Sequence, residues 1–217
     1  MNVLKNYWDL GSRVADIVEH VLSLPEPKLI LPTGSTPLSL YKELVNRQLD
    51  WSTTTTFNLD EYVINPNHPQ SYRSFMKKHL FDRIDIYPNN CNFPDRNTQA
   101  YEDIIPEVDL CILGIGSNGH IAFNEPGSSF DSVTRVVDLD KQTIEDNSRF
   151  FDSIEDVPTQ AITMGLKTIM KSKKIVLMAN GKYKKDILDK AMNGEVTEDV
   201  PASILQNHNN VEVYYCD

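Results

Sequence analysis

The fold is decided by one stretch, which reads Asp109-Leu-Cys-Ile-Leu-Gly-Ile-Gly-Ser-Asn-Gly-His-Ile-Ala-Phe-Asn-Glu-Pro126. The apolar run from Leu110 to Leu113 predicts a buried strand, and it leads directly into a glycine-rich loop that carries His120 and Glu125. Glycine permits positive φ and close approach of the backbone, so this loop can fold over a ligand and direct His120 inward. We therefore expect a central strand with a functional loop at its carboxyl end.

The same loop spells G-x-G-x-x-G, the dinucleotide-binding fingerprint, at Gly114, Gly116 and Gly119. That fingerprint requires a helix that begins inside the glycine motif, because the helix N-terminus binds the pyrophosphate. Phe-Asn-Glu-Pro-Gly at 123–127 predicts a turn there instead. We interpret the match as accidental and expect no cofactor.

Composition narrows the class of protein. The chain has 217 residues, 40% of them hydrophobic, and we see no linker or repeat, so we expect residues 1–217 to form a single domain with a full core. The formal charge of −10 is spread along the chain, which makes nucleic acid and anionic membranes poor partners. An anionic ligand would need positive groups gathered locally. No apolar run approaches the length of about twenty residues that spans a bilayer.

The cysteine and histidine spacings predict neither disulfides nor a metal site. Cys91, Cys111 and Cys216 lie far apart, with no paired spacing and no signal peptide ahead of them, so we expect a reduced, cytoplasmic protein. Cys111 falls inside the predicted central strand, where packing is its expected role. His68 and His79 lack a partner at metal-ligand spacing, and we interpret both as structural or exposed.

Elsewhere, predicted helices and strands alternate along the chain. We expect helices at 7–23, from 37, after Ser71, at 100–105, at 166–170 and after 184, and strands at 28–31, 53–59, 110–113, 134–139, 161–164, 174–178 and 211–215. Thr36 is the expected N-cap of the second helix, with Pro37 at its first position. Alternation of this kind predicts an α/β fold: a doubly wound, mostly parallel sheet with helices on both faces, similar to a Rossmann fold.

In such sheets, ligands bind outside the carboxyl ends of the strands. Four predicted strands end in chemically unusual residues: Gly34 to Thr36, Asp60 with Glu61, His120 with Glu125, and Lys182 to Lys185. Each group alone has a plain explanation, since Ser35 and Thr36 can serve only to cap a helix and paired acids can serve only to solvate a loop. Their concurrence at one edge favours an active site.

The types of residue at this edge suggest proton transfer on a phosphorylated small molecule. Gly34, Ser35 and Thr36 precede a helix N-terminus, which favours an anion, and Lys184 adds positive charge. The polar segment at about 141–157 carries Arg149 and is interpreted as a mobile lid that closes on that anion. A carboxylate base and a histidine beside a second acid suit the interconversion of an aldose and a ketose, which requires neither a cofactor nor a metal.

At this point the sequence resembles the glucosamine-6-phosphate deaminase family. The resemblance rests on Leu31-Pro-Thr-Gly-Ser-Thr-Pro37, Phe57-Asn-Leu-Asp-Glu-Tyr-Val63, Ser71-Tyr-Arg-Ser-Phe75, Gly114 to Pro126 and Asn147-Ser-Arg-Phe-Phe151. It runs from about residue 28 to the end, and Phe-Asn-Glu-Pro after Gly-His is its most specific part. Related lactonases that hydrolyse 6-phosphogluconolactone share the Gly-His loop but lack that Asn-Glu-Pro and the Asp-Glu-Tyr of the second motif.

The resemblance implies conversion of glucosamine 6-phosphate and water to fructose 6-phosphate and ammonia. It implies that Asp60 moves a proton from C2 to C1 and that His120 with Glu125 opens the sugar ring. It also implies that Gly34 to Thr36, Arg149 and Lys184 bind the phosphate.

The sequence departs from the family pattern at two places. Asn118 stands where some members have aspartate; an amide can orient His120 but cannot balance an imidazolium charge, so we expect Glu125 to carry more of that role. Val137 aligns with a lysine of members activated by N-acetylglucosamine 6-phosphate, although Ser128 and Arg135 match the rest of that effector site. The chain also lacks their C-terminal tail, and we therefore expect no such activation and a monomer.

Two other functions remain open. One is a lactonase or isomerase on the same scaffold, and the other is a sugar-phosphate sensor that binds without turnover. No helix-turn-helix segment precedes residue 28, and a sensor has no use for Asp60 and His120 together, so both points weigh against the sensor.

Overall fold

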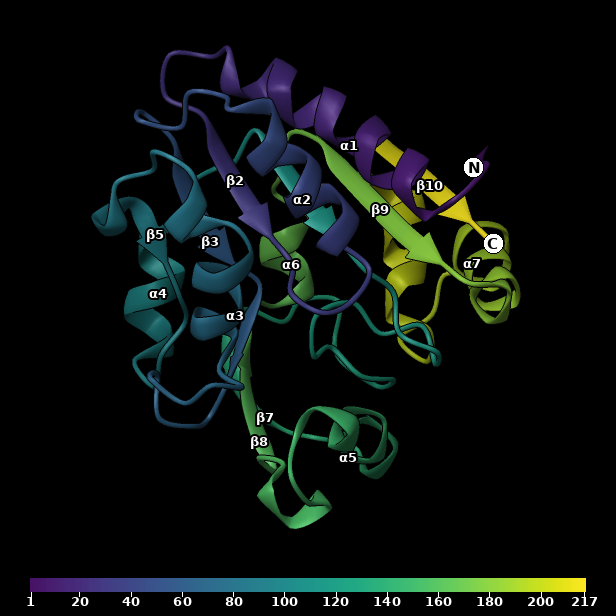
Figure 1. Ribbon diagram of the computed structural model, residues 1–217. Helices are drawn as coiled ribbons and strands as arrows, with labels where there is room; N and C mark the ends of the chain where they lie inside the picture. Colours follow the sequence, from purple (N-terminus) through teal and green to yellow (C-terminus); the bar gives the residue numbers. More distant parts are fainter.

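The computed structural model describes the backbone of residues 1–217 and every side chain except those of Gln142 and Asp146. Seven strands form the main sheet in the order β1-β10-β9-β6-β2-β3-β5, and every adjacent pair is parallel. They are β1 (Asn2–Leu4), β2 (Lys28–Leu31), β3 (Thr55–Asn58), β5 (Cys91–Asn92), β6 (Leu110–Leu113), β9 (Ile175–Asn180) and β10 (Val211–Cys216). The two chain termini lie side by side at one edge (Figure 1).

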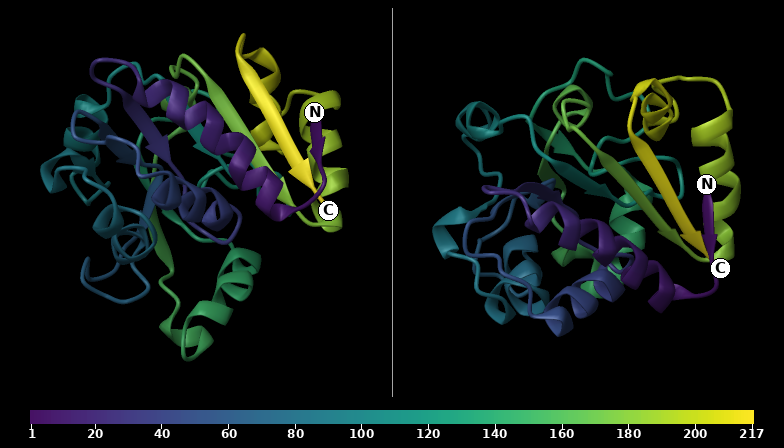
Figure 2. Two further views of the ribbon diagram at one scale, coloured as in Figure 1. Left: turned by 45° about the horizontal axis from the view of Figure 1, so that its top comes forward. Right: turned by 90° about the horizontal axis from the view of Figure 1, so that it is seen from above.

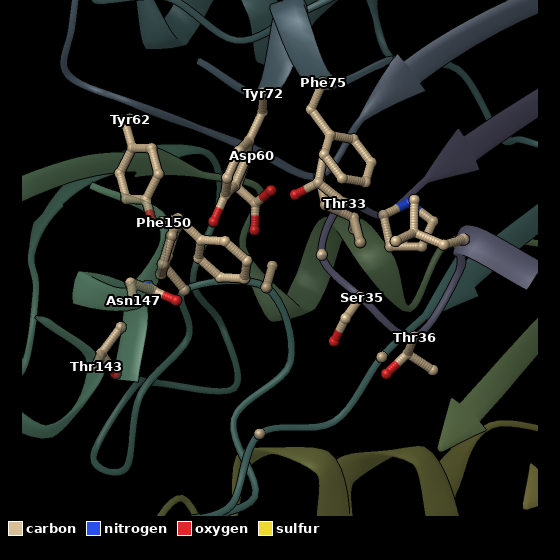
Figure 3. Close-up of a pocket in the computed structure, with 18 of the residues that line it drawn as sticks. Thr33, Ser35, Thr36, Asp60, Tyr62, Tyr72, Phe75, Thr143, Asn147 and Phe150 are labelled. Carbon is tan, nitrogen blue, oxygen red and sulfur yellow. The ribbon is translucent and has the colours of Figure 1, made fainter. Parts of the chain in front are cut away.

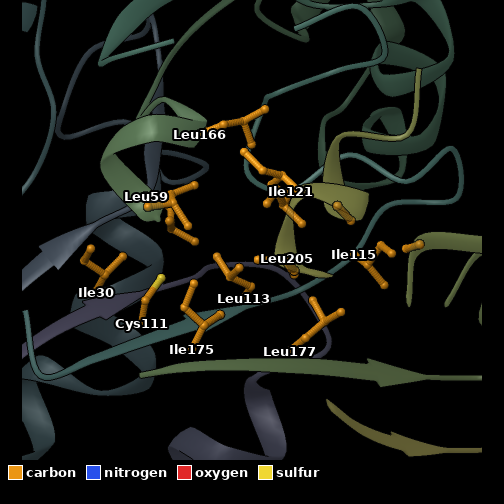
Figure 4. Packing of buried hydrophobic residues seen from close by; sticks show 14 of the residues in the cluster. Ile30, Leu59, Cys111, Leu113, Ile115, Ile121, Leu166, Ile175, Leu177 and Leu205 are labelled. Carbon is orange, nitrogen blue, oxygen red and sulfur yellow. The ribbon is translucent and has the colours of Figure 1, made fainter. Parts of the chain in front are cut away.

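Strand β6 lies in the middle of this sheet, and all four of its residues are buried. Leu110 and Ile112 belong to one core cluster, whereas Cys111 and Leu113 belong to the other. Figure 4 shows Cys111 and Leu113 within the second cluster. Side chains alternate between the faces of a strand, so a strand that is covered on both faces reads as a continuous apolar run. The prediction of a buried central strand is confirmed.

Helices cover both faces of the sheet, as predicted. One face packs against α1 (Tyr7–Leu22), α2 (Leu38–Arg47) and α3 (Tyr72–His79), and α1 and α2 lie together over it (Figures 1 and 2). The other face packs against α4 (Thr98–Ile104), α6 (Leu166–Ile169), α7 (Lys185–Asn193) and a 3₁₀ segment at Pro201–Asn207. None of the described helices is long and apolar enough to cross a membrane.

A second, smaller sheet accompanies the predicted parallel sheet and was not expected from the sequence. It is antiparallel, in the order β4-β8-β7, and consists of β4 (Asp60–Tyr62), β7 (Arg135–Asp138) and β8 (Gln160–Thr163). Leu59 alone separates β3 from β4: its N–H donates to the carbonyl of Leu31, and its carbonyl accepts from the N–H of Met164. The chain therefore passes from one sheet to the other just before Asp60.

The segment predicted as a lid follows β7. It contains α5 (Lys141–Asn147) and two 3₁₀ turns, at Ser148–Phe150 and Ile154–Asp156. In Figure 1 this segment lies apart from the main sheet, beyond the ends of β7 and β8. Ile144 and Phe151 pack it onto a small apolar cluster that includes Tyr62 and Phe123.

Candidate active site

A cavity of about 450 Å³ opens at the carboxyl ends of β2, β3, β6 and β9. Its lining includes the five residues predicted to bind phosphate, which are Gly34, Ser35, Thr36, Arg149 and Lys184, and two of the predicted catalytic residues, Asp60 and His120. Figure 3 shows Asp60 on one side of this cavity, with Ser35 and Thr36 on the other. Asn118 and Glu125 lie behind His120 and contact its ring. The structure thus brings all nine predicted residues to one place.

The loop after β2 turns at Gly34, whose φ of +95° favours glycine. A Cβ built on Gly34 would meet no described atom within 4 Å, so the backbone is open toward a ligand. Helix α2 then begins at Leu38, with Pro37 as its N-cap residue, one position later than predicted. Free N–H groups at a helix start favour an anion, as the sequence suggested.

The prediction that Thr36 caps α2 is wrong. Its hydroxyl donates instead to Oδ1 of Asn180, at the end of β9, at 3.0 Å. The hydroxyl of Tyr7, from α1, accepts a hydrogen bond from the N–H of Ser39 at 2.9 Å and donates to the carbonyl of Ser35 at 2.6 Å. Tyr7, rather than Thr36, therefore accepts a hydrogen bond from the first turn of α2, and its second hydrogen bond ties the loop to the helix start.

Two of the cations that line the cavity come from segments far apart in the sequence. Nζ of Lys184 donates to the carbonyl of Ile115 at 2.7 Å and lies 5.2 Å from the ring centroid of Tyr183. The guanidinium of Arg149 lies 4.8 Å from the ring centroid of Phe150, in the first 3₁₀ turn of the lid. Positive charge is therefore gathered locally in a chain whose formal charge is −10.

Asp60 is a buried carboxyl group at the cavity wall. It is 7% exposed, and its Oδ1 has no hydrogen-bond partner among the described residues. Burial, and after it the nearby charge of Glu61, raise the pKa of Asp60 from 3.8 to about 8. A carboxyl group with a pKa near neutrality can both accept and return a proton, as a general base for carbon chemistry must.

Glu61, by contrast, is a structural residue. Its carboxylate accepts hydrogen bonds from the N–H groups of Tyr62, Tyr72 and Arg73, at 3.0, 2.7 and 2.8 Å. Two of these groups belong to the first turn of α3, which begins at Tyr72, directly after Ser71 as predicted, and has Ser71 as its N-cap. The two neighbouring acids thus divide their roles, because Asp60 faces the cavity and Glu61 anchors the start of a helix.

His120 belongs to a hydrogen-bonded chain of four side chains. Its Nδ1 lies 2.8 Å from Oδ1 of Asn118 and 3.2 Å from Oε2 of Glu125. Nδ2 of Asn118 donates to the same Oε2 at 2.8 Å, while the hydroxyl of Thr143 donates to Oε1 of Glu125. Because Nδ1 is engaged in this chain, Nε2 is the ring nitrogen left for a ligand.

The carboxyl group of Glu125 is held in its ionised form. Burial acts to raise its pKa, but the hydrogen bond and the charge of His120 outweigh burial, and the hydrogen bonds from Thr143 and Asn118 add to them, so that the pKa falls to about 2. A fixed negative charge therefore lies beside the His120 ring and supports an imidazolium whenever one forms.

Two glycines of this loop allow the His120 ring to take its position. A Cβ on Gly116 would lie 2.2 Å from Cε1 of His120 and 2.3 Å from both ring nitrogens, so the ring occupies the space of a missing side chain. Gly119 has a φ of +89°, a backbone conformation that glycine adopts without the steric cost of a Cβ. From 114 to 134 the described backbone forms turns without a helix, which agrees with our interpretation of the G-x-G-x-x-G match as accidental.

His68 and His79, which we interpreted as structural or exposed, take no part in the hydrogen bonds around His120. The His68 ring stacks on the ring of Phe151, with 6.2 Å between the ring centroids. His79 packs against Phe75 at the edge of the cavity. Among the described side chains, no group of three or more His, Cys, Asp or Glu residues is placed to hold a metal ion.

Comparison with known proteins places this geometry in a family. Residues 9–214 match the model of the glucosamine-6-phosphate isomerases/6-phosphogluconolactonase family. The chain belongs to this family. A glucosamine-6-phosphate deaminase of Clostridium novyi is 49% identical over 223 residues, which is 95% of this chain and 92% of the relative. Another, from Mycoplasma mycoides, is 47% identical over 224 residues, which is 97% of this chain and 92% of the relative.

A solved structure agrees with the sequence comparison. It is described as a monomeric glucosamine-6-phosphate deaminase and is 38% identical to this chain. The match has a TM-score of 0.95 and covers 100% of this chain and 97% of the other. The mostly parallel sheet with helices on both faces is thus the fold of this glucosamine-6-phosphate isomerase/6-phosphogluconolactonase family.

Sequence reasoning missed two residues of the site. Tyr7 lies at the start of α1, 28 residues before the Ser35 carbonyl that it binds, and no local pattern links them. Thr143 lies in a polar segment with nothing to distinguish it from its neighbours. Both act through contacts that only the folded chain creates.

Ser128 and Arg135, which the sequence resemblance matched to an effector site, lie together in the structure. Arg135 donates to Oγ of Ser128 at 3.2 Å and to Oδ1 of Asn124 at 2.9 Å. Val137, which stands at the lysine position, packs against the apolar cluster under the lid.

Proposed function

We propose that this protein is a glucosamine-6-phosphate deaminase, which converts glucosamine 6-phosphate and water to fructose 6-phosphate and ammonia. One observation carries the proposal: a buried carboxyl group, Asp60, and an oriented imidazole, His120, line the same cavity as a phosphate-binding loop and two cations. Relatives at 45–49% identity over nearly the whole chain are glucosamine-6-phosphate deaminases, which supports it.

The phosphate end of the site fixes the position of the substrate. The loop at Gly34 to Thr36 offers backbone N–H groups and hydroxyls, and Lys184 and Arg149 offer positive charge. Such contacts bind ground state and transition state equally, so they set the affinity for substrate more than the rate of the chemical step.

The chemistry then proceeds in three steps. Nε2 of His120 accepts the proton of the anomeric hydroxyl and delivers it to the ring oxygen, which opens the ring to an aldehyde and leaves the imidazole neutral again. Ionised Asp60 removes the proton from C2 while one proton of the substrate ammonium passes to the aldehyde oxygen, which gives an enol amine. Asp60 then returns its proton to C1, which leaves an iminium group at C2. Water adds to that carbon, and ammonia departs to leave the ketone of fructose 6-phosphate.

Charge in the site suits each step. Glu125 stays ionised beside His120 and stabilises the imidazolium that forms when the ring opens. A pKa of about 8 makes the ionised form of Asp60 a stronger base than an ordinary carboxylate, and its conjugate acid can still return the proton to carbon. In this scheme no step requires a metal or a cofactor.

We further propose that the protein acts in the cytoplasm as a monomer. All three cysteines are free thiols, which suits a reducing compartment. The monomeric description of the 38% identical relative supports the second point. The chain has Val137 where effector-regulated members have a lysine, which supports activity without an effector. Saturation curves that change from sigmoid to hyperbolic on addition of N-acetylglucosamine 6-phosphate would contradict this proposal.

The deciding experiment measures ammonium and fructose 6-phosphate formed from glucosamine 6-phosphate by the purified protein. Equal amounts of both products are expected, together with no hydrolysis of 6-phosphogluconolactone. Asp60→Asn should retain binding and lose about 10²- to 10⁴-fold in turnover, the range for a positioned acid-base group. Lactone hydrolysis without ammonium would identify a lactonase, and binding without either product would identify a sensor.

A further inference from the structure

The hydroxyl of Thr143 links the lid to the ring-opening residues. Thr143 lies in α5, inside the lid segment, yet it is only 5% exposed, because its side chain reaches the carboxylate of Glu125. Figure 3 shows Thr143 at the cavity wall, in the segment that also carries Asn147 and Phe150. A polar side chain from the lid is thus inserted behind the catalytic histidine.

The two oxygens of Glu125 have separate partners. Oε1 accepts from Thr143, and Oε2 accepts from Nδ2 of Asn118 at 2.8 Å while it faces Nδ1 of His120 at 3.2 Å. A carboxylate rotates readily about its last bond, because that torsion is broad. A hydrogen bond on Oε1 therefore fixes the position of Oε2 as well.

Two contacts set the orientation of Asn118: its Nδ2 donates to Oε2 of Glu125, and the backbone N–H of His120 donates to its Oδ1 at 3.2 Å. An amide can present either its oxygen or its nitrogen to a neighbour, and here Nδ2 donates to Glu125 while Oδ1 faces Nδ1 of His120 at 2.8 Å. An aspartate at this position would have two equivalent oxygens and would need no such control. Because the chain has asparagine, each side chain from Thr143 to His120 fixes the next.

We propose that Thr143 is a positioning residue for ring opening: seating of the lid places its hydroxyl on Glu125, and this aligns Asn118 and His120 for catalysis. The inference rests on the proposed deaminase function. Ile144 and Phe151 pack the lid segment onto the apolar cluster at Tyr62 and Phe123. When this segment docks, the Thr143 hydroxyl reaches Glu125, so docking of the lid also orients His120.

The test compares three variants by the kinetics of glucosamine 6-phosphate turnover. Thr143→Val keeps the shape and removes the hydroxyl, and we expect kcat to fall at least about tenfold, as loss of a hydrogen bond to a charged group implies, with KM within about twofold. Thr143→Ser restores a hydroxyl and should recover most of kcat. Glu145→Gln, at an exposed position of the same helix α5, is the matched control and should stay within about twofold of the wild type.

A second measurement separates orientation of His120 from simple loss of the lid. The open-chain alditol of the substrate, 2-amino-2-deoxyglucitol 6-phosphate, has no ring to open, so its dissociation constant should be the same for Thr143→Val and the wild type. Equal weakening of kcat and alditol binding would overturn the proposal, as would wild-type kcat in Thr143→Val or failure of Thr143→Ser to recover. A wild-type protein that releases no ammonium would instead refute the deaminase function itself.

Discussion

Replacement of Asp60 by asparagine should stabilise the fold while it removes activity, and the gain should depend on pH. Burial raises the pKa of Asp60 from 3.8 to about 8, so between these values the folded protein holds a proton that the unfolded chain releases. The free energy of unfolding therefore falls by about 1.36 kcal/mol for each pH unit in this window. At pH 7 the accumulated loss is roughly 4 kcal/mol, which is large against the typical 5–15 kcal/mol for a whole domain.

Asparagine carries no charge at any pH, so Asp60→Asn removes this loss. We expect the difference in unfolding free energy between variant and wild type to be small near pH 4, to grow with pH, and to level off above pH 8. Urea unfolding from pH 4 to 9, followed by the fluorescence of the fully buried Trp51, measures it. Asp152→Asn, at an exposed site in the lid, is the matched control.

A difference that stays constant across pH 4 to 9 would show that Asp60 has an ordinary pKa in the folded protein. The assignment of Asp60 as a base with a pKa near neutrality would then be wrong, even if the variant were inactive. A slope of the opposite sign would mean that a positive group, rather than burial and Glu61, controls this carboxyl group.

Three further outcomes are expected. Gly116→Ala should lower kcat by about 10²-fold or more with an unchanged far-UV spectrum, because its Cβ would displace the His120 ring; near-normal kcat would mean that the ring can move without loss. Tyr7→Phe should raise KM several-fold at nearly constant kcat, because the loop carbonyl of Ser35 and the N–H of Ser39 lose their shared partner; an unchanged KM would show that the loop holds its shape alone. Lys184→Ala should chiefly raise KM, and a fall in kcat alone would place the phosphate elsewhere.

The main sheet and the site edge were predictable because their signals are local. A four-residue apolar run at Leu110 to Leu113 specifies a strand covered on both faces, and the carboxyl ends of parallel strands meet at one edge whatever their order. It was therefore possible to expect Asp60 and His120 near the same ligand without knowing the strand order. Their fine geometry still needed the structure.

What escaped prediction depends on contacts between distant parts of the chain. The strands at 134–139 and 161–164 were recognisable, but nothing local shows that they pair with Asp60–Tyr62 in a separate sheet. The edge strands β1 and β5 have three and two residues, with mostly exposed or half-exposed side chains, and so lack a periodic signal. Thr36 looked like a cap because the sequence could not reveal that Tyr7 already held the N–H of Ser39.

The single-residue link at Leu59 limits how this scaffold can be re-engineered. Leu59 is bonded to Leu31 on one side and to Met164 on the other, so both sheets fix the chain immediately before Asp60. Insertion or deletion of one residue there would reverse the side chains of β4, Asp60–Tyr62, and turn the carboxyl group away from the cavity. Grafts between family members must therefore exchange residues 55–62 as one block, so that Leu59 keeps its place between the two sheets and Asp60 keeps its direction.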